Sequence, residues 1–236
     1  MHALIYTLID GLKGVFFPNI CMACKDGLPG TKNLICTYCR TQRFEDPNPD
    51  RLTSLPLIIL PESVDFQDAM WLFDKAGGLR ALLHSIKYDG LIRLAHDLGQ
   101  LMYTQVFSKR IESQTWTSDN TVILPVPMHS LRHRKRGYNQ AAEIALGFSM
   151  VSGIPLIEEN VVIRSRFTRS QTGFSQTRRA QNVRSAFTVQ RPDCLLHRKV
   201  LIIDDVFTTG ATTFELAQTL LEYRVTGCGI ITVAAT

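Results

Sequence analysis

Two adjacent carboxylates followed by small polar residues form the part of this sequence with the clearest chemical meaning. Asp204 and Asp205 come directly after four apolar residues, 200–203, which predict a buried strand. The run Thr208-Thr209-Gly210-Ala211-Thr212 then leads into a segment with the apolar spacing of a helix. Free N–H groups and the dipole at a helix start attract anions. We therefore expect a ligand with a phosphate for the loop and vicinal hydroxyls for the aspartates.

Simpler interpretations of this loop explain only part of the pattern. A capped helix after a core strand would account for one Asp and one Gly as turn residues, but not for two acids followed by Thr-Thr-Gly-Ala-Thr. A Walker-type loop is excluded, because no Gly-Lys-Ser or Gly-Lys-Thr follows the turn. We expect Gly210 to let the backbone approach the anion where a Cβ would obstruct it.

Four of the six cysteines form two CxxC pairs, Cys21 with Cys24 and Cys36 with Cys39, with eleven residues between the pairs. Two such pairs can close a tetrahedral Zn²⁺ site, and four thiolates leave no open position for water or substrate. Disulfides are disfavoured in a reducing compartment, and a redox CxxC motif needs no matched second pair. The spacing therefore predicts a structural zinc site.

Composition and hydropathy are those of a globular protein. The 236 residues are 45% hydrophobic, enough for one sizeable core and a small appendage. No apolar run reaches the roughly 18–20 residues of a transmembrane helix. Residues 1–18 are apolar, but Asp10 and Lys13 interrupt them and no small-residue cleavage site follows, which favours a short amphipathic helix over a signal peptide. We expect a cytoplasmic protein without a membrane span.

Positive charge is concentrated in the middle of the chain. Residues 131–199 hold thirteen Lys and Arg against four Asp and Glu, whereas the remainder holds thirteen against seventeen. A basic middle on a mildly acidic body indicates an anionic partner. A polyphosphate and a nucleic-acid backbone both remain open, because charge does not separate them.

A Pro-rich connector, residues 45–55, follows the cysteines and predicts two domains, 1–45 around the metal and 46–236. The metal would supply the folding free energy of the first. From residue 56 onward strand and helix patterns alternate, which predicts an α/β fold with helices on both faces of a parallel sheet and ligands at the carboxyl ends of its strands. We expect strands at 57–60, 122–126, 161–164, 200–203 and 229–234, and helices at 78–88, 91–106, 138–149 and after Thr212.

Two basic segments are candidates for binding the anion. The first runs from the strand end at residue 124 through Arg136 to Gln140, and is either a pyrophosphate site or a solvated turn. The second, residues 164–187, holds six arginines and no acid. It is either a lid that closes over a polyanion or a basic insert without fixed structure. Lys87 stands near a predicted helix end, and the residues alone give it no function.

Taken in order, these segments resemble the competence protein F family, which is counted among the type I phosphoribosyltransferases. The apolar strand, the two aspartates and the threonine-rich loop are similar to the phosphoribosyl pyrophosphate (PRPP) signature of those enzymes. The resemblance covers nearly the whole chain. It rests on the four-cysteine head, Ile86-Lys87-Tyr88, Pro125-Val126-Pro127, Arg136 to Gln140, Thr172 with Gln176, Arg178-Arg179, Asn182-Val183-Arg184, Ala186-Phe187 and the PRPP signature.

The resemblance implies a type I phosphoribosyltransferase-like sheet that binds PRPP with Mg²⁺. It further implies transfer of the phosphoribosyl group to an unidentified nitrogen acceptor, with release of pyrophosphate. Asp204 and Asp205 would face the ribose hydroxyls and the magnesium shell, and Phe207 to Thr212 would wrap the ribose phosphate. Arg136, Arg178 and Arg179 would neutralise the departing pyrophosphate.

A non-catalytic function remains open beside the enzymatic one. The family takes its name from DNA uptake, so the protein could handle single-stranded DNA or contact other uptake proteins while retaining PRPP binding. The basic middle could follow a single strand, and Tyr138, Phe167, Phe174 and Phe187 could stack on its bases.

Overall fold

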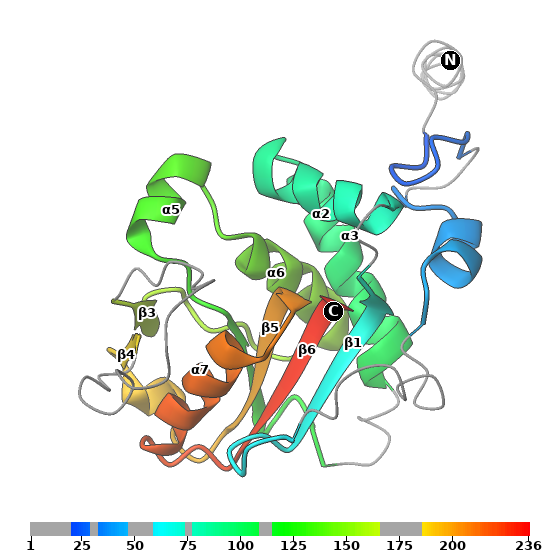
Figure 1. Ribbon diagram of the computed structural model, residues 1–236. Coiled ribbons are helices and arrows are strands. Elements are labelled where there is room, and N and C mark those ends of the chain that lie inside the picture. The colour runs from blue at the N-terminus through cyan, green and yellow to red at the C-terminus, as the bar shows by residue number, and fades with distance from the viewer. Residues whose placement is uncertain (1–19, 29–32, 47–58, 74–76, 109–114, 166–185) are drawn as a thin grey trace, which may run out of the picture.

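The computed structural model describes residues 20–28, 33–46, 59–73, 77–108, 115–165 and 186–236. The centre of the described chain is a four-stranded sheet in the order β1-β6-β5-β2, and all three pairings are parallel (Figure 1). Every residue of β6 is buried, as expected for a central parallel strand covered on both faces. The strands are β1 (Phe66–Leu72), β2 (Thr121–Pro125), β5 (Lys199–Phe207) and β6 (Gly227–Ala235).

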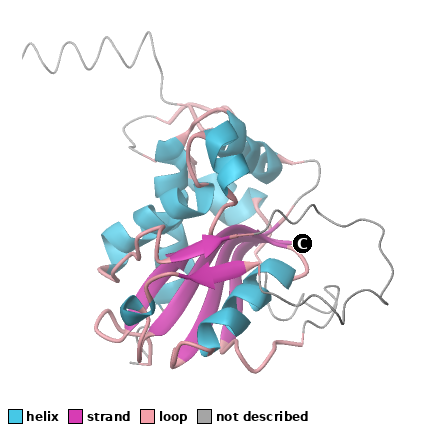
Figure 2. Cartoon of the chain, turned by 90° about the vertical axis from the view of Figure 1, so that its left-hand side faces the viewer, coloured by secondary structure: helices cyan, strands magenta, loops and turns pink. Residues whose placement is uncertain are grey.

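Helices cover both faces of this sheet (Figure 2). Side chains alternate along β5, so Leu201 and Ile203 pack into one core while Val200 and Ile202 pack into another. The first core includes three helices and the second includes one, which confirms the predicted α/β arrangement. They are α2 (Gly78–Tyr88), α3 (Ile92–Met102) and α6 (Gln140–Ser152) in the first core, and α7 (Ala211–Leu221) in the second.

The structure corrects several expected element positions. At 57–60, the described residues 59–60 have no regular structure, and the edge strand is β1 instead. The strand expected at 161–164 is β3 (Val162–Arg164), which leaves the main sheet and pairs antiparallel with β4 (Phe187–Val189). A short helix, α5 (Ser130–Arg136), and three single-turn segments complete the described elements: the π-helical turns Cys39–Arg43 and Tyr103–Phe107, and the 3₁₀ turn Pro192–Cys194.

Helices α3 and α6 cross with their backbones in direct contact. A Cβ on Gly147 would lie 2.6 Å from the Cα of His96, and one on Gly99 would lie 2.6 Å from the backbone nitrogen of Phe148. A hydrogen bond between His96 Nε2 and Glu143 Oε2, 2.7 Å long, joins the same two helices. This crossing fixes the position of α6, whose first turn borders the cavity described below.

The cysteine-containing segment packs against the edge of the sheet. The rings of Phe44 and Trp71 lie 4.7 Å apart between centroids, and Trp71 Nε1 donates to the carbonyl oxygen of Arg40 at 3.3 Å. The backbone N–H of Leu72 donates to the carbonyl of Glu45 at 2.8 Å. These described residues share one core with β1 and α2, while the domain boundary at residue 45 stays a prediction. No helix in the described part of the chain is long and apolar enough to cross a membrane.

Candidate functional site

A cavity of about 1040 Å³ opens beyond the carboxyl ends of β2 and β5. This is the edge at which open parallel sheets bind ligands. Of the residues expected to bind PRPP, Asp204, Asp205, Thr212 and Arg136 line it. Its other walls come from the end of α2, the segment 126–129 after β2, α5 and the start of α6.

Asp204 and Asp205 reach the cavity because β5 extends beyond the end of its neighbour β2. The pairing of β2 with β5 ends at Ile203, whereas β5 continues beside β6 to Phe207. Both aspartates therefore lie within the strand, near its carboxyl end. The sequence pattern had placed them after the strand. The backbone N–H of Asp205 donates to Asp204 Oδ1 at 2.8 Å, which holds the first carboxylate against the strand.

Burial raises the pKa of Asp204 well above its ordinary value, and the neighbouring charge of Asp205 raises it further. Lys87 partly offsets both effects. A pair of close carboxylates with this electrostatic cost is stabilised by a cation. Carboxylate oxygens are also the ligands that Mg²⁺ prefers, so this donor set fits the ion that the sequence resemblance implies.

The loop after β5 is shaped by two phenylalanine rings. Gly210 has a positive φ of 74°, and a Cβ there would lie 2.6 Å from Phe214 Cζ and 2.8 Å from Phe207 Cζ. Close packing and backbone conformation thus require this glycine, in addition to any ligand. Phe207 is buried and its carbonyl accepts the N–H of Thr236 at 3.0 Å, so its side chain does not face a phosphate. The Thr209 hydroxyl accepts the N–H of Ala211 at 3.4 Å, and Thr208 and Thr209 are exposed.

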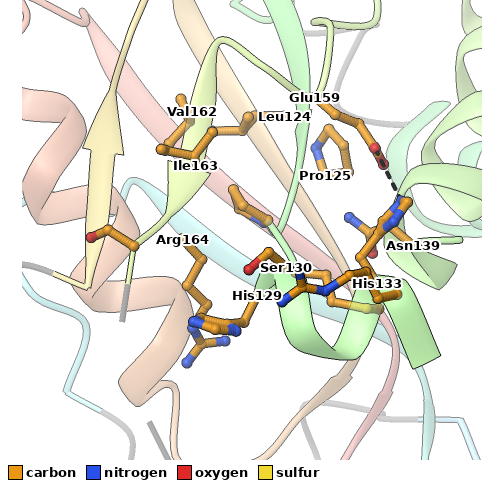
Figure 3. A pocket seen from close by; sticks show the side chains of 14 residues that line it. Leu124, Pro125, His129, Ser130, His133, Asn139, Glu159, Val162, Ile163 and Arg164 are labelled. Carbon is orange, nitrogen blue, oxygen red and sulfur yellow. Dashed lines mark ion pairs between the residues drawn. The ribbon is translucent and has the colours of Figure 1, made fainter. Parts of the chain in front are cut away.

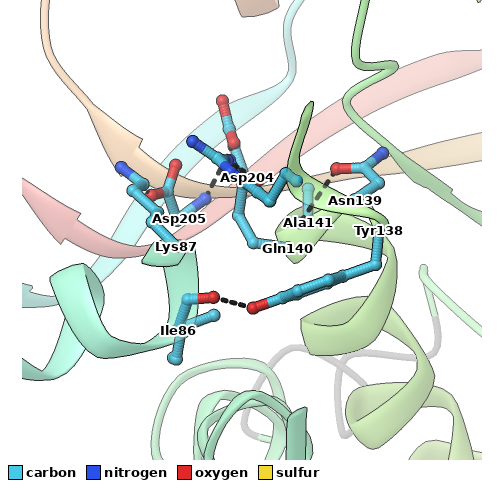
Figure 4. A network of polar contacts seen from close by, with 9 residues as sticks. Ile86, Lys87, Tyr138, Asn139, Gln140, Ala141, Asp204 and Asp205 are labelled. Carbon is cyan, nitrogen blue, oxygen red and sulfur yellow. Dashed lines mark hydrogen bonds and ion pairs between the residues drawn. The ribbon is translucent and has the colours of Figure 1, made fainter. Parts of the chain in front are cut away.

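Three consecutive residues at the end of α2, Ile86 to Tyr88, contact the site. They belong to the segments that carry the family resemblance, but the residue pattern assigned them no function. Lys87 Nζ forms an ion pair with Asp205 Oδ2, and the Tyr138 hydroxyl donates to the carbonyl of Ile86 (Figure 4). The Arg136 guanidinium lies 5.3 Å from the centre of the Tyr88 ring. The last turn of α2 therefore joins β5 to the turn between α5 and α6.

Asn139 holds the turn between α5 and α6 in place. Its Oδ1 accepts the N–H of Ala141 at 3.1 Å, which caps α6, and its Nδ2 donates to the carbonyl of Val126 at 3.1 Å. Arg136 donates to the side chain of Gln140. The side chain of Arg136 is thereby fixed at the wall of the cavity.

The four cysteines predicted to bind zinc come together. Their sulfur atoms all lie within 4.8 Å of one another, and those of Cys24 and Cys36 are 3.7 Å apart. Burial opposes ionisation of Cys21, but N–H groups of Cys36, Cys24 and Ala23 outweigh it and lower the pKa of the Cys21 thiol to about 6. All four are free thiols, and the thiolate is the form that binds metal. The cluster could hold a metal such as zinc.

Comparison with known proteins identifies the family. Competence protein F of Haemophilus influenzae is 27% identical over 218 residues, which cover 89% of this chain and 94% of that protein. The DNA utilization protein YhgH of Shigella flexneri is 30% identical over 213 residues, which cover 87% and 92%. The chain belongs to the competence protein F family. No family model matches it. A structure of the allosteric regulatory enzyme of purine biosynthesis is 21% identical, covers 59% of this chain and 25% of that chain, and has a TM-score of 0.37.

Arg178 and Arg179, which the competence protein F resemblance assigned to pyrophosphate, lie outside the described residues. The described ends of their segment are paired, because β3 places Arg164 opposite Phe187 of β4. Arg164 lines the cavity. Burial lowers the pKa of its guanidinium, and the nearby positive charge of Arg132 lowers it further to a smaller extent. Phe187 is buried beneath the Arg164 guanidinium, 5.5 Å from the ring centre, and does not offer a free face for a nucleic-acid base.

A second cavity of about 480 Å³ adjoins the first (Figure 3). Leu124, Val162 and Ile163 contribute apolar lining, and His133 Nε2 lies 3.8 Å from Glu159 Oε2 at one side. Arg164 and the segment 127–129 line both cavities. The chain thus offers a larger polar compartment beside a smaller, more apolar one.

Proposed function

We propose that this protein binds PRPP with Mg²⁺ at the carboxyl end of β5 and transfers the phosphoribosyl group to a nitrogen acceptor. The observation that carries the proposal is the pair Asp204 and Asp205 at the end of a parallel strand, directly before the N-terminus of α7 and facing the larger cavity. Cationic side chains of α5 that line the same cavity, Arg132 and Arg136 among them, suit a polyphosphate.

Each group has a separate part in the proposed reaction. The carboxylates of Asp204 and Asp205 bind the ribose hydroxyls and the metal shell, and the loop Thr208 to Thr212 binds the ribose phosphate. Arg136, with Arg178 and Arg179, stabilises the departing pyrophosphate. Mg²⁺, when bound, adds positive charge at the same leaving group.

Charge stabilisation is the main contribution of the protein to this reaction. The C1–oxygen bond of PRPP breaks, a C1–nitrogen bond forms, and the acceptor nitrogen loses its proton to solvent. Because the transition state would resemble an oxocarbenium ion beside a leaving anion, fixed cations lower its free energy more than that of the ground state. The held position of Arg136 supports this role.

We also propose that Zn²⁺ is the ion held by Cys21, Cys24, Cys36 and Cys39. Four thiolates close the coordination sphere, which makes the site structural. The metal would stabilise the segment that carries Phe44 against β1 and would take no part in the reaction.

A second candidate function is handling of single-stranded DNA without catalysis. Helix α5 carries five consecutive basic residues, 132–136, and has no buried residue. Such a helix beside the cavity could follow a phosphate backbone. The names of the relatives, which refer to competence and DNA utilization, support this candidate as well.

Pyrophosphate release from PRPP separates the two functions. We expect release that depends on Mg²⁺ and on one of a panel of nitrogen bases. Replacing both Arg178 and Arg179 with alanine should lower the rate of pyrophosphate release far more than it lowers the affinity for PRPP. Binding of single strands without release under any condition would favour the second function. The variant Arg132→Gln/Arg134→Gln should then reduce the log–log salt slope by about 0.7 for each lost phosphate contact.

A further inference from the structure

The last turn of α2 contributes a cation to a place where the proposed function requires a metal. Lys87 and Asp205 lie far apart in the sequence, yet their side chains form an ion pair at the wall of the larger cavity (Figure 4). A C-terminal cap for α2 would explain Gly90, but it gives no reason for a lysine at position 87. The contact with Asp205 supplies one.

This ion pair is shielded from water to a greater degree than the exposed pair between Arg191 and Glu158. The side chains of Lys87 and Asp205 are 26% and 9% exposed, whereas those of Arg191 and Glu158 are 51% and 68% exposed. Charges interact more strongly where water is excluded. Removing the ammonium would leave the Asp205 carboxylate buried without its counter-charge, next to Asp204.

The backbone that carries Lys87 is held in place through its two neighbours. The Tyr138 hydroxyl binds the carbonyl of Ile86, and Arg136 lies over the ring of Tyr88, so both neighbours of Lys87 are tied to the turn between α5 and α6. A lysine side chain has a flexible four-carbon stem and a compact charge. The ammonium can therefore leave Asp205 for another anion in the cavity without movement of α2.

We propose that Lys87 pairs with Asp205 in the metal-free protein, releases Asp205 when the divalent cation binds, and then binds the diphosphate of the ligand. The inference rests on the proposed function of this site. A divalent ion at the two carboxylates and an ammonium at one of them repel each other, so the ion alone binds weakly. A diphosphate that arrives with the metal gives the ammonium a new partner.

One consequence is that the cation and the diphosphate bind cooperatively. Each favours the state in which Lys87 has left Asp205, and coupling of this kind typically amounts to about 5–150-fold in affinity. The device would keep the site from filling with the divalent ion alone. It would also place a positive charge at the leaving group only when a ligand is present.

The test measures Mn²⁺ binding by electron paramagnetic resonance, with and without inorganic pyrophosphate. Lys87→Met removes the charge and keeps the length of the side chain. Lys135→Met removes an equal charge from an exposed lysine at the same cavity and serves as the control. Lys87→Arg keeps the charge, and Lys87→Gln repeats the neutral change in case methionine disturbs α2.

We expect Lys87→Met to bind Mn²⁺ alone at least about fivefold more tightly than Lys135→Met, and to lose at least about fivefold of the enhancement by pyrophosphate. Lys87→Arg should resemble the unmodified protein. Equal Mn²⁺ affinity in the two methionine variants, or an unchanged enhancement, would overturn the proposal. If these results hold while the unmodified protein binds no PRPP, the proposed function fails and the role of Lys87 stands.

Discussion

Replacing Gly147 with alanine should destabilise the protein, although alanine is the better helix former. In an exposed helix the change stabilises by about 1 kcal/mol. Here the new Cβ would lie 2.6 Å from the Cα of His96 and 2.7 Å from its carbonyl carbon. Those are backbone atoms of α3, which cannot rotate away, so the two helices must move apart.

The magnitude follows from two opposing contributions. Overpacking of a close-packed interior costs about 1–3 kcal/mol, and the rigid backbone contact places Gly147 at the upper end of that range. Subtracting about 1 kcal/mol of helix propensity leaves a net loss of about 2 kcal/mol. For a protein of this size the melting temperature should fall by about 4–8 °C.

Urea denaturation followed by circular dichroism measures this loss, and Gly78→Ala is the matched control. At Gly78, the first residue of α2, a Cβ would lie 3.5 Å from its nearest atom, which is ordinary contact. That variant should be as stable as the unmodified protein or slightly more stable. A Gly147→Ala protein with unchanged stability would refute the backbone contact between α3 and α6.

Two further predictions concern the metal cluster and the carboxylate pair. Metal analysis should find one zinc ion per chain, and a chain without metal would contradict this. Chelation should lower the melting temperature and change the fluorescence of Trp71, because the Cys39–Arg43 turn packs on that ring. Folding raises the pKa of Asp204, so its ionisation destabilises the metal-free protein as pH rises above the usual carboxyl range. Asp204→Asn should therefore be more stable than the unmodified protein at neutral pH and equally stable at acid pH. A lower melting temperature of the variant at neutral pH, measured in Mg²⁺-free buffer, would contradict this.

The elements that the sequence predicted well are those with local periodicity. The apolar residues 200–203 and the spacing of Leu79, Leu82, Leu83 and Ile86 lead directly to β5 and α2. Strand β1 was missed because Gln67 and Asp68 interrupt its apolar pattern at the edge of the sheet. Helix α5 was missed because it buries no residue and therefore has no apolar periodicity.

For the site too, the sequence predicted the features that depend on local patterns and not those that depend on packing between distant elements. The position of Asp204 and Asp205 follows from the apolar residues 200–203 that precede them in β5, and the clustering of the cysteines follows from their spacing. The contact between Lys87 and Asp205 depends on how α2 packs beside β5, which leaves no local pattern in the sequence. Gly210 was predicted for its closeness to a ligand, whereas packing against Phe207 and Phe214 already requires it.

Isothermal titration of PRPP in the presence of Mg²⁺ tests the central claim most directly. We predict that the unmodified protein binds PRPP only with Mg²⁺, and that Asp204→Asn/Asp205→Asn folds but no longer binds. In a melting experiment the same ligand at a hundredfold excess over Kd should stabilise the unmodified protein by about 2.7 kcal/mol. Equal PRPP affinity in the two proteins, or no binding to the unmodified one, would contradict the assignment of this site.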